Sequence, residues 1–213
     1  MHIPDGFLSP SVWSIAWLFS AGGLAYCVKK VREILKDKMV PLMGVMAAFI
    51  FAAQMLNFPV AGGTSGHLLG GVLAAVLLGP CAGAIVISCV LVVQCLIFQD
   101  GGLTALGANI FNMAFVGTVV GYFLYRVLAK VIGGAKGIMT GAAIASWFSV
   151  VLASSVCALE LALSGTSPLK IALPAMAGVH TLIGIGEAIV TCLVIGFVLK
   201  VRPDLIYNYQ EEK

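Results

Sequence analysis

The feature that most constrains this chain is a series of apolar runs, several of them as long as a bilayer is thick. A transmembrane helix needs roughly 20 apolar residues, because each residue adds ~1.5 Å across a hydrocarbon core of ~30 Å. Of the 213 residues, 61% are hydrophobic and 10% are charged, whereas about a quarter of a soluble domain is charged. We therefore expect one transmembrane domain over residues 1–213 that is embedded in a lipid bilayer and has no nucleic-acid partner.

The apolar runs predict an all-α integral membrane protein, a bundle of seven transmembrane helices. The third and fourth runs are short, and a single re-entrant hairpin over 67–98 is the alternative. Gly79 and Pro80 between them indicate a tight turn between two helices. The predicted spans are residues 9–29, 40–58, 67–79, 81–98, 103–130, 137–164 and 170–200.

The basic residues predict an orientation. With seven spans, every Lys and Arg except Lys170 lies on one side of the membrane, which places the N-terminus outside and the C-terminus in the cytoplasm. The first basic residue is Lys29, so the chain does not begin like a signal peptide, and we expect its first residues to be retained. The residues on the cytoplasmic side are Lys29, Lys30, Arg32, Lys36, Lys38, Arg126, Lys130, Lys136, Lys200, Arg202 and Lys213.

The opening "MHIPDG" offers three nitrogens to a metal ion: the Met1 amine, the His2 amide once its proton is displaced, and His2 Nδ1. The chelate rings keep the three nitrogens near one plane and leave one in-plane position for another histidine. Square-planar nitrogen ligation suits Ni(II) or Cu(II). Pro4 favours an extended Ile3 and Gly6 permits a turn, so residues 1–8 are predicted to fold back into the bundle as the metal-binding segment.

His67 is the candidate for the fourth ligand. It lies in the glycine-rich "AGGTSGHLLGG", which includes Gly62 and Gly63, and the predicted topology places it on the same outer face as His2. We expect Thr64 or Ser65 to cap a helix that begins near His67. The alternative is a histidine whose ring is satisfied by a loop carbonyl.

Further polar residues are candidates for hydrogen bonds to the ligands, because polar groups at membrane depth usually face the bundle interior and a ligating imidazole usually donates its second N–H. Hydrogen bonding between helices is the alternative role, and His180 is also an alternative ligand. The polar candidates are Gln54, Gln94, Asp100, Asn109, Asn112, Glu160, His180 and Glu187.

The six cysteines form no C-x-x-C pair, and we interpret them as packing residues.

The stretches "MHIPDGFLSP", "GGTSGHLLGG", "FQDGGLTALGANIFNMA" and "HTLIGIGEA" resemble the substrate-specific membrane component of energy-coupling-factor nickel/cobalt transporters, the NikM/CbiM family. The resemblance covers nearly the whole chain. It implies a six-helix core with an additional N-terminal span, in a bacterial or archaeal cell membrane. It also implies metal donors at Met1, His2 and His67, with Ni(II) as the transported ion and Co(II) as the neighbouring possibility. The implied partners are a transmembrane coupling component, ATP-binding-cassette ATPase subunits and a small accessory membrane protein.

Three other functions are alternatives to metal capture: binding of an organic vitamin, catalysis by a membrane metalloenzyme and a purely structural role. The sequence contains no G-x-x-x-x-G-K-[ST] phosphate loop, so we expect no ATPase activity. We expect a transporter subunit and not an enzyme. A component of the same transporter class could instead bind an organic vitamin, but such a site should be apolar and aromatic. A membrane metalloenzyme would need an open metal position for water or substrate. A purely structural role leaves the two outer histidines unexplained.

Overall fold

The computed structural model describes the chain except for residues 35–38, 61–63 and 209–213. Lys36, Lys38 and Lys213, and also Gly62 and Gly63, therefore lie outside the described residues. The helical elements are α1 (Pro10–Ile34), α2 (Met39–Gln54), α3 (Gly71–Leu78), α4 (Pro80–Phe98), α5 (Leu106–Ile110), the π-helix η1 (Phe111–Val120), α6 (Gly121–Ile132), α7 (Gly134–Leu163), α8 (Leu169–Val201) and the 3-10 turn η2 (Pro203–Leu205).

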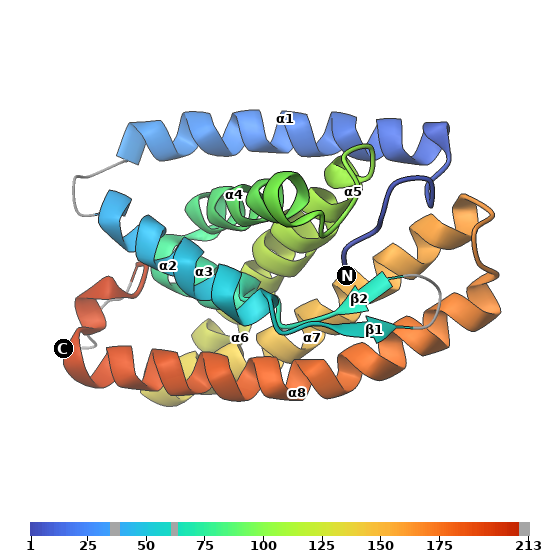
Figure 1. Cartoon of the computed structure of the whole chain (residues 1–213). Helices are drawn as coiled ribbons and strands as arrows, with labels where there is room; N and C mark the ends of the chain where they lie inside the picture. Colours follow the sequence, from blue (N-terminus) through green and yellow to red (C-terminus); the bar gives the residue numbers. More distant parts are fainter. Residues whose placement is uncertain (35–38, 61–63, 209–213) are drawn as a thin grey trace.

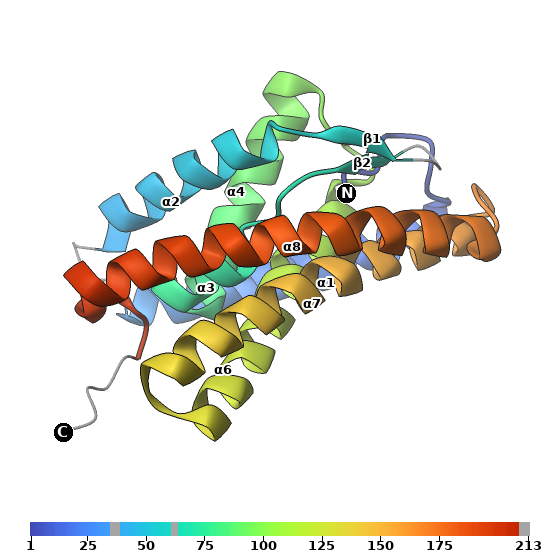
Figure 2. The ribbon, with the colours of Figure 1, turned by 90° about the horizontal axis from the view of Figure 1, so that it is seen from below.

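The expected all-α transmembrane bundle is confirmed. Among the described residues, five helical stretches are long and apolar enough to cross a membrane: α1, α4, the continuous stretch Leu106–Ile132, α7 and α8. Helices α1 and α8 lie on opposite sides of the molecule, with α4 and α5 between them (Figures 1 and 2). Large apolar side chains such as Leu18, Val131 and Leu182 point outward, more than two thirds exposed, as suits lipid contact. The number of crossings and the orientation stay predictions.

Helix α3 is shorter than the run that predicted it. The run covers residues 67–79, but the helix begins at Gly71, because Gly70 has the left-handed φ of 75°. Its eight residues are all buried and extend only about 12 Å, too little to cross a bilayer unaided. The predicted turn is confirmed, since Gly79 has a φ of 86° and Pro80 opens α4.

A short β-hairpin replaces the helix cap that Thr64 or Ser65 was expected to form. Strand β1 (Phe58–Val60) pairs antiparallel with β2 (Thr64–Gly66), so the expected cap was wrong. No side chain caps α3 at Gly70. The hairpin lies beside the N-terminus in both views (Figures 1 and 2), so it forms one wall around the first residues.

The middle of the Leu106–Ile132 stretch is a π-helix, and Thr118 donates a hydrogen bond of 2.8 Å to the carbonyl of Met113, five residues earlier. Packing against α3 is close here. A Cβ on Gly117 would lie 2.2 Å from Leu69 Cδ2, and one on Gly71 would lie 2.6 Å from Thr118 Oγ1. The wide helical turns thus face the segment that joins His67 to α3, and π-helical turns frequently occur near functional sites.

Candidate metal centre

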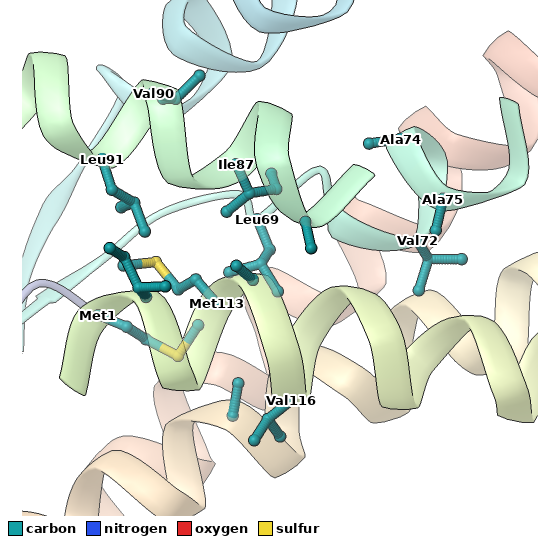
Figure 3. Close-up of a cluster of buried hydrophobic side chains, with 14 of the residues drawn as sticks. Met1, Leu69, Val72, Ala74, Ala75, Ile87, Val90, Leu91, Met113 and Val116 are labelled. Atoms are coloured by element: carbon teal, nitrogen blue, oxygen red, sulfur yellow. The ribbon is translucent and has the colours of Figure 1, made fainter. Parts of the chain in front are cut away.

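The N-terminal segment lies inside the bundle. Met1 and Ile3 are fully buried and His2 is 3% exposed, which is unusual for the start of a chain. Figure 3 shows the Met1 side chain in the same apolar cluster as Leu69 and Met113. Burial of the thioether thus holds the amine of the same residue beside the hairpin.

Asn109 holds the backbone of the segment at Ile3. Its Oδ1 accepts a hydrogen bond of 2.8 Å from the Ile3 N–H, and its Nδ2 donates one of 3.2 Å to the Ile3 carbonyl. The Gly102 N–H donates to the same carbonyl at 2.9 Å. Both main-chain groups of Ile3 are therefore satisfied in a buried position, as buried backbone requires.

Asp5, which is exposed, forms a second attachment of the segment. Its carboxylate accepts hydrogen bonds from the Leu103 N–H at 3.0 Å and the Thr104 N–H at 2.7 Å. The hydrogen bond from the Thr104 hydroxyl, followed by these backbone bonds, lowers the pKa of Asp5. The "PDG" stretch is thereby tied to the loop between α4 and α5.

The Met1 amine contacts β2 and is neutral at pH 7. It donates to the Ser65 carbonyl and lies 3.4 Å from Ser65 Oγ. Burial lowers the pKa of this amine from 8.0 to about 5. An uncharged amine has a lone pair that a metal ion can use, whereas an ammonium group has none.

His2 presents its Nδ1 as a lone-pair donor. Its Nε2 lies 3.0 Å from Gln94 Oε1, which can only accept, so the proton is on Nε2. Burial, and then the charge of the amino terminus, lowers the pKa of His2 to about 3. The Nδ1 atom lies 3.3 Å from Asp100 Oδ1, but it has no partner in hydrogen-bond geometry among the described residues.

His67 presents the opposite nitrogen. Its Nδ1 donates 2.7 Å to the carbonyl of Leu68, which leaves Nε2 without a partner among the described residues. Burial, and then the charge of the amino terminus, holds the pKa of His67 well below 6.5. The rings of His2 and His67 lie 4.6 Å apart between centroids, with 30° between their planes. We call His2 Nδ1 and His67 Nε2 the open nitrogens.

The open nitrogens are unusual, because nearly all buried polar atoms have a hydrogen-bond partner. Two neutral imidazoles and a neutral amine stand together here as lone-pair donors. The described residues contain no group of three or more His, Cys, Asp or Glu side chains that could hold a metal ion. A metal site in this part of the chain therefore needs main-chain nitrogen as well, as the "MH" chelate supplies.

The polar residues that were candidates for hydrogen bonds to the ligands differ in what they contact. Glu187 accepts hydrogen bonds from the Leu69 N–H at 2.7 Å and the Gly70 N–H at 2.6 Å, so it fixes the backbone just after His67. Asp100 lies beside His2, and burial raises its pKa. Asn112 instead donates a hydrogen bond of 2.6 Å to Glu160 on α7.

His180 is fully buried on α8, and its Nδ1 donates 2.7 Å to the carbonyl of Met176 one turn earlier.

Ser65 is the contact that the sequence did not suggest, since its residue type indicated a helix cap. Its backbone carbonyl, which has no sequence signature, is what receives the amine.

Comparison with known proteins decides the family. Residues 2–205 match the family model of CbiM, described as the cobalt uptake substrate-specific transmembrane region. The chain belongs to the CbiM family. The resemblance found in the sequence motifs is thereby confirmed.

Relatives of this CbiM-family chain are metal transport proteins. A protein of Archaeoglobus fulgidus, provisionally named as the fused nickel transport protein NikMN, is 43% identical over 97% of this chain and 68% of its own length. The fused nickel transport protein NikMN of Rhodobacter capsulatus is 35% identical over 97% of this chain and 64% of its own length. A crystal structure titled as a truncated transition metal transporter superposes with a TM-score of 0.88 at 36% identity, covering 94% of this chain and 99% of the other. The CbiM-family chain is thus a multi-pass membrane component of nickel or cobalt transport.

Proposed function

We propose that the chain is the substrate-binding component of an energy-coupling-factor importer, and that it captures Ni(II) or Co(II) with its N-terminal segment. The proposed donors are the Met1 amine, the His2 amide nitrogen, His2 Nδ1 and His67 Nε2. The observation that carries the proposal is the pair of open nitrogens. They belong to two buried rings whose centroids lie 4.6 Å apart, and the amine of the residue before His2 is neutral.

The hydrogen bonds around the donors support this assignment. Gln94 and the Leu68 carbonyl each bind the ring nitrogen that would not face the ion, so both imidazoles have the tautomer that ligation needs. Among the described residues, the His2 N–H has a single long contact, 3.4 Å to Ser65 Oγ. Loss of its proton to a bound metal would therefore break no strong hydrogen bond.

The donor set favours a planar ion. Three consecutive nitrogens of one chain end form two fused chelate rings and cannot easily reach a tetrahedral arrangement. The His67 imidazole would then complete the plane, which suits Ni(II) or Cu(II), and the nickel transport named in two relatives favours Ni(II). We propose Co(II) as the second ion that the site accepts.

The chain would act together with partner subunits. We propose that a transmembrane coupling component, ATPase subunits and a small accessory membrane protein drive uptake, because the sequence has no phosphate-binding loop of its own. The distribution of Lys and Arg along the sequence supports an outward-facing metal site with the N-terminus outside and the C-terminus in the cytoplasm.

The test compares metal titration of the purified wild-type chain with that of a variant that carries one additional Ala before Met1. The wild type should bind one Ni(II) per chain and turn yellow and diamagnetic, as four-coordinate planar Ni(II) does. The extension moves the amine out of the chelate and should abolish tight binding. Full-strength binding by the extended chain would exclude the N-terminal donor set.

A further inference from the structure

Helix α3 is too short to be stable by itself, so the groups that bind its two ends decide where it lies. An isolated helix shorter than about 12 residues is marginal in water, and α3 has eight residues, all of them buried. Each end of a buried helix leaves main-chain groups that need partners from elsewhere in the chain. The segment that carries His67 leads directly into α3, so whatever fixes this helix also fixes the backbone that follows the proposed ligand.

One end of α3 is bound by α8. Glu187 accepts hydrogen bonds from the N–H groups of Leu69 and Gly70, the two residues that come just before the helix, at 2.7 Å and 2.6 Å. The Gly70 carbonyl then accepts the hydrogen bond of 3.0 Å from the Ala74 N–H. The carboxylate on α8 therefore supplies the cap that α3 lacks in its own sequence.

The other end of α3 is bound by the segment that follows α8, residues 202–207, which we call the C-terminal strap. The Tyr207 N–H donates a hydrogen bond of 2.9 Å to the carbonyl of Val76, in the last turn of α3. The Tyr207 ring covers the turn that follows, since a Cβ on Gly79 would lie 2.9 Å from Tyr207 Cε2. Ile206 is only 4% exposed, so the strap is packed on the protein, unlike most chain ends.

Helix α8 and the strap thus hold α3 at both ends. The strap follows the red end of α8 in Figures 1 and 2 and lies at one end of the molecule, away from the hairpin and the N-terminus. From Glu187 to Val201, α8 extends about 21 Å, enough to run past the about 12 Å of α3. Helix α3 also packs backbone to backbone on α4, where a Cβ on Gly83 would lie 3.0 Å from the Ala75 nitrogen. A short helix packed this closely moves as a unit, so a change at one end shifts the other.

We propose that Tyr207 is a positioning residue of the metal site: the C-terminal strap holds α3, α3 holds the backbone after His67, and detachment of the strap loosens the grip on the ion. The inference rests on the proposed function, because it concerns retention of nickel by that same site. It gives the strap a role in release, since an event at one end of the bundle then frees an ion bound near the other.

The physical reason is the carbonyl that the strap satisfies. Val76 is 0% exposed, so detachment leaves its carbonyl as a buried acceptor without a donor, which costs free energy until α3 shifts or frays. His67 precedes the helix by four residues, and its ring is oriented by the Leu68 carbonyl. A shift of α3 therefore displaces the ring nitrogen that is proposed to bind the ion.

The coupling must act in both directions. If detachment of the strap weakens nickel binding tenfold, then saturating nickel must make detachment tenfold rarer, because the two effects are linked by one free energy. A residue that only supports the fold has no such link to the metal.

The first test uses Tyr207→Pro, which removes both the N–H that binds Val76 and the ring that covers Gly79. Chelator competition should show nickel affinity reduced about tenfold, with faster loss of the ion. Phe197→Ala is the control, because it removes an aromatic ring from the same end of α8 but from a side chain that is 67% exposed. It should leave nickel affinity unchanged.

Wild-type nickel affinity in Tyr207→Pro, with or without a lower thermal midpoint, would make the strap purely structural and would overturn the inference. Equal losses of affinity in the two variants would overturn it as well. A wild-type chain that binds no nickel would instead refute the proposed function, and the inference with it.

The second test needs no variant of the strap. Hydrogen exchange of the wild type, followed by mass spectrometry of overlapping C-terminal peptides, should show the Tyr207 amide exchanging about tenfold more slowly when nickel is saturating. The chain with one additional Ala before Met1 should show no such slowing. Unchanged exchange in a wild type that does bind nickel would overturn the inference even if Tyr207→Pro does not fold.

Discussion

The imidazole rings of His2 and His67 lie 4.6 Å apart between centroids, and each has one buried nitrogen without a hydrogen-bond partner among the described residues. One ring comes from the start of the chain and the other from the stretch between β2 and α3. Each ring is fixed through its other nitrogen, by Gln94 and by the Leu68 carbonyl. The arrangement is prepared before an ion arrives, so little reorganisation opposes binding.

His67→Asn is expected to remove the fourth planar donor while keeping an N–H near the position of Nδ1 that binds the Leu68 carbonyl. Nickel affinity should fall by about 100-fold or more, which corresponds to about 2.8 kcal/mol. The free energy of unfolding of the metal-free protein should change by less than about 1 kcal/mol, because the structural hydrogen bond is retained. Chelator competition and thermal unfolding measure the two effects. Wild-type retention of nickel by the variant would take His67 out of the ligand set.

Asn109→Ala is expected to release the N-terminal segment. The substitution removes both hydrogen bonds to Ile3 and leaves its buried N–H without an acceptor, at a cost of about 1–3 kcal/mol. Because the amine and His2 then lose their position, metal affinity should fall about 10–100-fold, as for other residues that orient ligands.

Asn112→Ala is the matched control for this prediction. Asn112 lies three residues further along and is equally buried, but it bonds Glu160 instead of the segment. It should lower the thermal midpoint without a comparable loss of metal affinity. Equal losses of affinity in the two variants would show that Asn109 acts through general stability alone.

Gly102→Ala tests how closely the segment packs on the loop between α4 and α5. The added Cβ would lie 2.2 Å from the backbone nitrogen of Asp5, so the "PDG" stretch must move. We expect a loss of about 1–3 kcal/mol in the free energy of unfolding, together with weaker nickel binding.

Gly22→Ala provides the comparison, since a Cβ there meets no described atom within 4 Å. On the exposed side of α1 it should be neutral or stabilise by up to about 1 kcal/mol. Metal titration and thermal unfolding of both variants check the pair. Normal nickel binding by Gly102→Ala would mean that the segment tolerates displacement.

Sequence reasoning predicted the parts that depend on local pattern. Apolar runs predicted the membrane helices, and Gly79–Pro80 predicted the turn between α3 and α4. It did not predict where α3 begins, because the groups that satisfy the Leu69 and Gly70 amides belong to Glu187, more than 100 residues away. Nor could it separate Asn109 from Asn112, which are both polar candidates three residues apart yet bond different partners. The spacing of residues predicts which face of a helix a side chain lies on, whereas its hydrogen-bond partner depends on tertiary packing.

The last prediction concerns pH. The pKa values of the Met1 amine, about 5, and of His2, about 3, mean that both groups are already unprotonated at pH 6. Protons should therefore not compete for these donors between pH 6 and 8. The His2 amide, however, must lose its proton to bind, so the association constant for nickel should still rise about tenfold per pH unit in this range.

Below about pH 5 the amine becomes protonated as well, and the rise with pH should be steeper there. Titrations in buffers that do not bind nickel, corrected for chelator protonation, measure the slope. A slope of zero between pH 6 and 8 would mean that the amide keeps its proton and that the ion uses a different fourth donor. A slope near two in the same range would mean that the amine is charged at pH 7, contrary to its burial beside Ser65.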